Sequence, residues 1–204
     1  MLTRIAVLVS GGGTNLQALL DAQGAGQLPH GEIILAVSDV PGAYALERAE
    51  KVGVPVHALP RRQLGNAEFE RRLSALLSEH RADMVILAGF LGILSGEFTA
   101  RWPRRILNIH PSLIPSFCGM GMYGLKVHRA ALDYGVKVTG ATVHYVNEIP
   151  DGGQILLQKA VEILPGDTPE VLQRRVMEQA EWILLPRAAE LVARRIYEEK
   201  ESGK

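Results

Sequence analysis

The sequence predicts one α/β domain built on a doubly wound, mostly parallel sheet. Short apolar runs of strand length alternate with helix-length segments through the first half of the chain. This alternation is typical of βαβ units with right-handed crossovers. The 204 residues, 47% of them hydrophobic, suffice for one sizeable core. Because no internal repeat, low-complexity tract or linker divides the chain, we expect a single domain, residues 1–204.

The first part, 1–105, consists of predicted strands separated by predicted helices. The strands are short apolar runs bounded by turn-forming or charged residues: 4–9, 32–38, 55–59 and 83–88, followed by 105–110 at the boundary. The helices have apolar residues at helical spacing: 16–25, 44–52 and 66–80. Pro55 places the strand 55–59 at a sheet edge, because proline cannot donate to a ladder. Ser95 is expected to cap a further helix.

The second part, 106–204, supplies the predicted catalytic and closing elements. Residues 116–122 are glycine-rich and are expected to form a mobile loop, followed by a helix over 123–134. Strands over 136–146 and 154–163 are joined by a turn. A long helical segment from residue 167 closes the chain, and Pro186 is expected to break or kink it.

Composition excludes several function classes. Lys plus Arg and Asp plus Glu balance at 22 each, whereas an extended nucleic-acid surface usually requires a basic surplus. The single cysteine, Cys118, excludes an intrachain disulfide and fits a reducing compartment. No Cys/His cluster has metal-ligand spacing, and no apolar run is long enough to cross a bilayer. We therefore expect a soluble, cytoplasmic protein, monomeric or homodimeric, without metal, nucleic-acid or membrane partners.

The strand 105–110 ends in an unusual pair of polar residues. Asn108 and His110 are two positions apart, so they project from the same face of a strand, and Pro111 keeps His110 extended. A carboxamide and an imidazole at the carboxyl end of a strand combine a hydrogen-bond donor with a proton-transfer group, and ligands bind at that edge of open α/β sheets. A polar strand end with a capping histidine is the structural alternative.

A glycine run, Gly11 to Gly13, separates the first strand from the first helix. Glycines allow close backbone approach, and the free N–H groups of a helix N-terminus attract an anion, so a phosphate site is plausible here. Thr14 and Asn15 can cap the helix or donate to an oxygen. The run is not a dinucleotide fingerprint, because Leu16 stands where the third glycine would be. A tight turn without a ligand remains the alternative.

Two further segments are candidates with strong structural alternatives. The run 89–94 is apolar and contains glycine, so it can line a pocket for a flat apolar ligand or simply close the core. Asp151 precedes two glycines in the turn 147–153, which is ordinary turn chemistry. His144, inside the strand 136–146, is a candidate for positioning site residues without contacting the substrate.

Taken together, these segments resemble the folate-dependent formyltransferases, and within them the phosphoribosylglycinamide formyltransferase branch. The matching segments occur in the family's order: 9–16, 87–95, 107–115, 138–144 and 151–155. The resemblance implies a Rossmann-like formyltransferase fold. It also implies formyl transfer from 10-formyltetrahydrofolate, as co-substrate, to the amine of glycinamide ribonucleotide in purine synthesis.

The resemblance also implies roles for individual residues. The catalytic residues would be Asn108, His110 and Asp151. The residues that bind the nucleotide substrate would be Gly12, Gly13, Thr14, Asn15, Gly89 and Glu181. The residues that bind the folate would be Asn66, Phe90, Leu91, Gly92, Ile93, Leu94, Asn108 and Val146.

The chemistry suits the proposed catalytic residues. Formyl transfer to an amine passes through a tetrahedral intermediate with a developing oxyanion, which the uncharged Asn108 carboxamide can stabilise. His110 can donate to the same oxygen or protonate the departing N10, and an adjacent Asp151 would favour the imidazolium. No covalent intermediate is needed, so we assign no nucleophile to Cys118 or to any serine.

The chain departs from the family pattern at four positions, of which Gln154, in place of a frequent proline, is expected to be harmless. Gly92 stands where members often have arginine, and Asn66 where some carry a basic residue, so two contacts to the folate are in question. Arg61 and Arg62 are not expected to substitute for them. The segment before Glu181 is one residue longer than in many members, which puts the position of Glu181 in question.

Alternative functions remain. A methionyl-tRNA formyltransferase would be expected to carry an added C-terminal domain, and a formyl-folate hydrolase a domain ahead of the core. A non-catalytic nucleotide- or folate-binding module of the same fold is the alternative outside enzymes.

Overall fold

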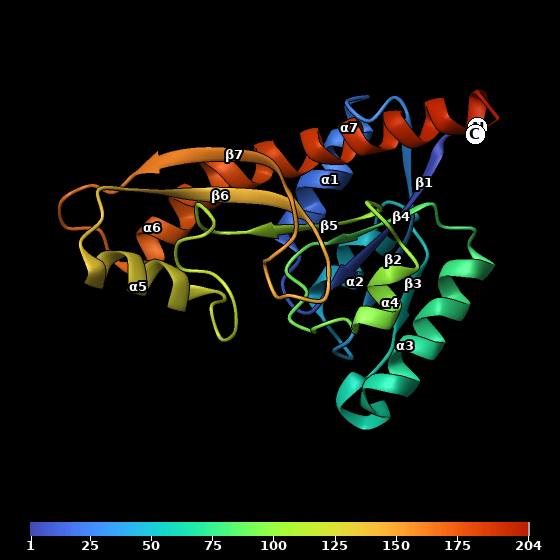
Figure 1. Cartoon of the computed structure of the whole chain (residues 1–204), viewed down its shortest axis with the longest axis horizontal. Coiled ribbons are helices and arrows are strands. Elements are labelled where there is room, and N and C mark those ends of the chain that lie inside the picture. The colour runs from blue at the N-terminus through green and yellow to red at the C-terminus, as the bar shows by residue number, and fades with distance from the viewer. Residues whose placement is uncertain (204) are drawn as a thin grey trace.

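The computed structural model describes residues 1–203 and shows a seven-stranded sheet with helices on both faces (Figure 1). The strands are β1 (Thr3–Val9), β2 (Gly31–Ser38), β3 (Val56–Ala58), β4 (Met84–Leu87), β5 (Ile106–His110), β6 (Val138–Tyr145) and β7 (Ile155–Glu162). The helices are α1 (Thr14–Gly24), α2 (Tyr44–Glu50), α3 (Arg61–Glu79), α4 (Gly96–Ala100), α5 (Leu125–Tyr134), α6 (Pro169–Val176), the π-helical turn η1 (Met177–Glu181) and α7 (Trp182–Glu201).

The sheet order is β3-β2-β1-β4-β5-β6-β7. The strands from β3 to β5 are parallel, and β6 and β7 are added antiparallel. The predicted doubly wound, mostly parallel sheet is confirmed, and β3 lies at the edge as Pro55 indicated. Because β1, β4 and β5 are neighbours, their carboxyl ends meet along one edge of the sheet.

Two apolar layers cover the sheet. Ile5 and Val7 of β1 pack in the layer that contains residues of α1 and α7, whereas Ala6 and Leu8 face the layer that contains Phe69 of α3. This alternation follows from the twofold repeat of strand side chains. Figure 1 shows α7 along one side of the sheet and α3 on the other. Strand β1 is therefore buried on both faces, as its continuous apolar run indicated.

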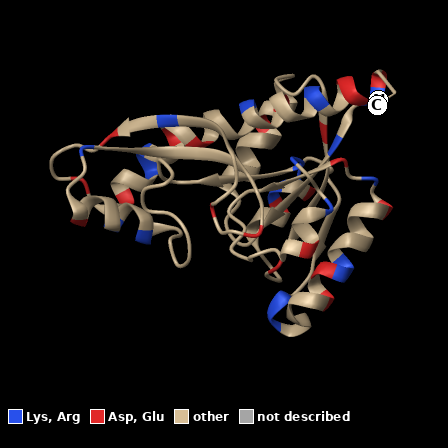
Figure 2. Ribbon diagram, viewed as in Figure 1, with Lys and Arg blue, Asp and Glu red and all other residues tan. Residues whose placement is uncertain are grey.

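Charged residues of both signs are interspersed on the outer helices. In Figure 2, Lys and Arg alternate with Asp and Glu along α3 and α7. Arg71 and Arg72 both pair with Glu68 on α3, and Arg194 pairs with Glu198 on α7. These two helices therefore present mixed rather than strongly basic surfaces.

Two helices differ from the expectation. Helix α3 consists of two helices joined at a kink at Gly65 (φ 75°, ψ 166°), whose angles glycine adopts readily; the second begins at Asn66, as predicted, whereas the first turn from Arg61 was not predicted. Pro186 neither breaks nor ends α7, which continues to Glu201. Pro186 has no N–H to donate to the carbonyl four residues earlier, which belongs to Trp182. Trp182 is the first residue of α7, so the missing hydrogen bond lies at the junction with η1 and not within the helix.

Candidate active site

A cavity of about 750 Å³ opens at the carboxyl ends of β1, β4 and β5. Its volume is in the range of small-molecule sites. The expected residues that line it are Gly12, Gly13, Thr14, Asn15, Gly89, Phe90, Leu91, Gly92, Ile93, Leu94, Asn108, His110, Val146, Asp151 and Glu181. Asn66 is not among the lining residues; it lies on α3 beside Arg61.

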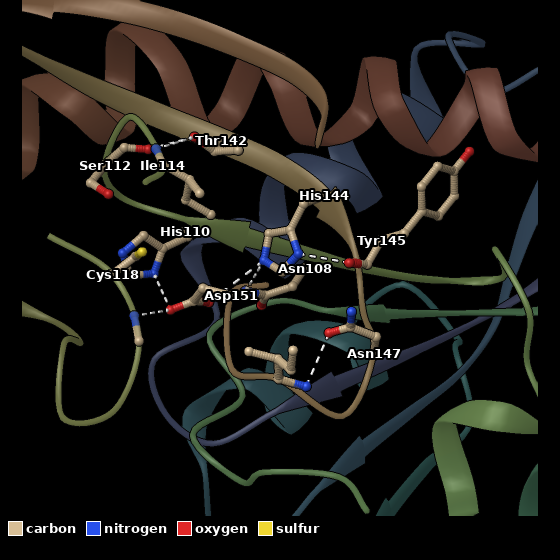
Figure 3. A network of polar contacts seen from close by, with 12 residues as sticks. Asn108, His110, Ser112, Ile114, Cys118, Thr142, His144, Tyr145, Asn147 and Asp151 are labelled. Atoms are coloured by element: carbon tan, nitrogen blue, oxygen red, sulfur yellow. Dashed lines mark hydrogen bonds and ion pairs between the residues drawn. The ribbon is translucent and has the colours of Figure 1, made fainter. Parts of the chain in front are cut away.

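The predicted catalytic residues lie together in this cavity (Figure 3). Strand β5 presents Asn108 and His110 on one face, and Asp151 comes from the β6–β7 connection. The Asp151 Oδ2 atom is 3.4 Å from His110 Nδ1, and its Oδ1 atom accepts from Asn108 Nδ2 at 3.4 Å. Asp151 has a positive φ of 56°, an unusual conformation that Asp tolerates better than most residues. Residues 43 positions apart thus form one polar cluster.

His144 supports the cluster from the neighbouring strand. Register between β5 and β6 pairs Asn108 with His144, and the Asn108 Nδ2 atom is 3.1 Å from His144 Nε2. The His144 Nδ1 atom donates to the Tyr145 carbonyl at 2.8 Å, because a carbonyl can only accept. The same Nε2 atom is 3.5 Å from Asp151 Oδ1, so His144 contacts both residues. His144, flagged from its strand position, therefore orients Asn108.

Burial and charge act against each other on the His110–Asp151 pair. Burial lowers the pKa of His110 below its usual value, although the Asp151 carboxylate acts in the opposite direction. Burial raises the pKa of Asp151, but the contact with His144 and the charge of His110 outweigh it, so this pKa is lower than usual. We expected Asp151 to favour the imidazolium. The carboxylate does act to raise the pKa of His110, but burial lowers that pKa by more. At pH 7 the aspartate is therefore ionised and His110 is mostly neutral.

The loop 116–122 is docked on this pair. The Phe117 carbonyl accepts from His110 Nε2 at 2.9 Å, and the Gly119 N–H donates to Asp151 Oδ2 at 2.9 Å. Both ring nitrogens of His110 therefore face groups of the protein itself. The predicted mobility of this loop stays a prediction, and its contacts show what any movement would release.

The glycine loop joins the first helix through a left-handed residue. Gly13 has φ 73°, and a Cβ atom there would lie 2.5 Å from the Ala45 Cβ atom. Only glycine fits so close to α2, and the loop then exposes the N-terminus of α1 to the cavity. The Arg48 Nε atom donates to the Gly12 carbonyl at 2.8 Å. This arrangement is suited to binding a phosphate.

Glu181 reaches the same end of the cavity from the π-helical turn η1. Its Oε2 atom accepts from Asn15 Nδ2 at 2.7 Å, and only 6% of the residue is exposed. Burial raises the pKa of Glu181 to about 7, although the hydrogen bond from Asn15 acts to lower it. The π-helical turn η1 covers the segment in which the resemblance implies one additional residue, and Glu181 at its end lines the cavity.

The apolar wall of the cavity is formed by 90–94. Phe90 is buried and stacks on Phe69, with ring centroids 6.0 Å apart. Leu91 and Ile93 are 61% and 47% exposed. Exposed apolar side chains beside a cavity are suited to a flat apolar ligand.

Several functional groups were not identified from the sequence. Gly119 and Phe117 act through their backbone, which no residue pattern reports. Gln173 and Met177 line the cavity from the closing helices. The glycine content of 116–122 indicated the loop, but nothing in the sequence indicated that Gln173 and Met177 line the cavity.

No helix within residues 1–203 combines the length and apolar character needed to span a membrane. No group of three or more His, Cys, Asp or Glu side chains within the same residues is placed to hold a metal ion.

Comparisons with known proteins agree with this geometry. The chain is 43% identical over 202 residues to the trifunctional purine biosynthetic protein adenosine-3 of Gallus gallus, covering 98% of the chain but only 19% of that relative. It is 40% identical over 177 residues to the phosphoribosylglycinamide formyltransferase of Haemophilus influenzae, covering 86% of the chain and 81% of the relative.

Solved structures of similar fold include a protein of the same activity class by name. The crystal structure of glycinamide ribonucleotide transformylase 1 from Symbiobacterium toebii superposes with a TM-score of 0.87 at 42% identity, covering 95% of this chain and 88% of that one. The family model described as formyl transferase matches residues 3–188. This match includes both the glycine loop and all three predicted catalytic residues, and the chain belongs to the formyl transferase family.

Proposed function

We propose that the chain transfers the formyl group of 10-formyltetrahydrofolate to the amine of 5-phosphoribosylglycinamide, a step of de novo purine biosynthesis. One observation carries the proposal: Asn108, His110 and Asp151 meet in a cavity between a glycine loop and an apolar wall. The loop is suited to the phosphate of the nucleotide and the wall to the pterin of the folate. The names of the relatives from Haemophilus influenzae and Symbiobacterium toebii support the same substrates.

The reaction follows from the properties of the three residues. The substrate amine attacks the formyl carbon directly and forms a tetrahedral intermediate, whose oxyanion the Asn108 N–H stabilises. The ionised Asp151, through a water molecule, is placed to accept the proton that the amine loses. Asp151 passes this proton to His110 Nδ1, which lies 3.4 Å from Asp151 Oδ2, and the imidazolium delivers a proton from Nε2 to N10 as that nitrogen leaves, so that the amine loses one proton and N10 gains one.

His110 needs a free ring nitrogen to take part. In the structure Nε2 donates to the Phe117 carbonyl, and Phe117 lies on the loop 116–122. Gly119 and Gly121 have φ values of 88° and 82°, so this loop contains residues able to change conformation at low cost. We propose that substrate binding displaces the Phe117 carbonyl and that the loop then closes over the reactants.

The proposal is tested by following deformylation of 10-formyltetrahydrofolate spectrophotometrically, with and without 5-phosphoribosylglycinamide. Deformylation that requires the ribonucleotide is the expected result. Deformylation without it would identify a formyl-folate hydrolase, and the proposal would be wrong. Saturable folate binding without any turnover would instead identify a binding module.

A further inference from the structure

Both proposed substrates are anions, yet the cavity lining contains no lysine or arginine within the described residues 1–203. Glycinamide ribonucleotide carries a phosphate, and the folate carries the carboxylates of its glutamate tail. Positive charge must therefore come from the rim. Arg48 supplies it at the glycine loop, where it contacts Gly12. The corresponding group at the apolar wall is Arg61.

Arg61 is held against the wall from the first position of α3. Its backbone N–H donates to the Asp39 carbonyl at 3.2 Å. Its Nε atom donates to Asn66 Oδ1 at 2.9 Å, and Nη2 donates to the Ile93 carbonyl at 2.5 Å. The guanidinium also lies 5.5 Å from the centroid of the Phe69 ring. These contacts from both sides of the cavity rim fix the orientation of the guanidinium.

The guanidinium occupies space that exists only because residue 92 is glycine. A Cβ atom at Gly92 would collide with Arg61 Nη1 and would lie 2.7 Å from the Phe90 ring. Nη1 has no hydrogen bond, and Arg61 has no ion pair, within residues 1–203. Arg61 therefore combines a fixed orientation with unused donors beside Ile93, which is 47% exposed.

We propose that Arg61 binds a carboxylate of the folate glutamate tail. The inference rests on the proposed function, because it assumes the folate co-substrate. The apolar pterin packs on the wall, and the hydrated carboxylates remain at its solvent side, where the guanidinium lies. Asn66 then acts through Arg61, by accepting from its Nε atom, rather than by touching the folate.

The test compares Arg61→Ala with Arg62→Ala, the exposed neighbouring arginine, as matched control. We expect Arg61→Ala to raise the KM for 10-formyltetrahydrofolate about tenfold, with kcat within about twofold, since a solvated carboxylate–guanidinium contact lies at the weaker end of charge-assisted bonds. Arg62→Ala should leave both constants unchanged. With 10-formyltetrahydropteroate, which lacks the glutamate, wild type and Arg61→Ala should have the same KM.

A binding measurement separates this inference from the proposed function. Calorimetric titration with tetrahydrofolate and tetrahydropteroate reports Kd whether or not the ribonucleotide is the acceptor. An equal loss of affinity for both ligands in Arg61→Ala would show a merely structural role and overturn the inference, as would no loss for either. Gly92→Ala should displace the guanidinium, weaken tetrahydrofolate binding as Arg61→Ala does, and add nothing in the double variant. Additive losses would also contradict the inference.

Discussion

The buried carboxyl of Glu181 should make the stability of the ligand-free protein depend on pH. Its environment offers one hydrogen bond, from Asn15 Nδ2, and no compensating cation within residues 1–203. Glu181→Gln preserves the size of the side chain and an oxygen that accepts from Asn15, but it removes the titration. We therefore expect the variant to be more stable than the wild type in neutral and alkaline solution and equally stable in acid.

The magnitude follows from the pKa. Burial raises the pKa of Glu181 from 4.5 to about 7. Between these values the folded state holds a proton that the unfolded state has lost, so the free energy of unfolding falls as pH rises. Each pKa unit is worth about 1.4 kcal/mol, and the cost therefore reaches about 3 kcal/mol above pH 7.

Urea unfolding of the ligand-free proteins at several pH values between about 4.5 and 8.5 measures this difference. The stability of Glu181→Gln relative to wild type should increase by about 3 kcal/mol across that range. Glu178→Gln is the matched control, because Glu178 lies on the same turn η1 but is exposed and paired with Arg174. A Glu181→Gln curve parallel to that of the wild type would refute the reasoning.

Three further substitutions test the site. Asn108→Ala should lower kcat by about 10²–10³ with KM little changed, because it removes the oxyanion donor; steady-state kinetics with near-normal turnover would contradict this role. Asp151→Asn should lower turnover severely and move the acid limb of the pH–rate profile to lower pH, because the carboxylate raises the pKa of His110; an unmoved limb would disprove their coupling. Gly13→Ala should cost about 3 kcal/mol of stability in thermal or urea unfolding, from its positive φ and the collision with Ala45, whereas Gly12→Ala, with open space around its Cβ, should stay within about 1 kcal/mol.

The parts of the fold set by local pattern could be predicted from the sequence. Continuous apolar runs identified the buried strands, and Pro55 identified the sheet edge. Asn108 and His110 were predicted on one face of a strand because side-chain direction there follows from a twofold repeat. Asp151 was different, since Asp-Gly-Gly is an ordinary turn, and only the family resemblance indicated its role. Its contact with His110 depends on how β6 and β7 are added to the sheet.

Contacts between distant segments could not be predicted. The position of Arg61 depends on the short helical turn that precedes the kink at Gly65, and the apolar spacing predicted only the helix that follows the kink. The pKa of His110 depends on how deeply the loop 116–122 and Asp151 bury the ring, which no local pattern reports.

Glu181 shows why residue spacing alone can mislead about a site. In a regular α-helix, one additional residue rotates everything that follows by about 100°, so an insertion before Glu181 would turn it away from the cavity. A π turn closes with one more residue than an α turn, so the π-helical turn η1 is suited to accommodate the additional residue that the resemblance implies. Helix α7 therefore keeps its apolar face against the sheet while Glu181 still meets Asn15.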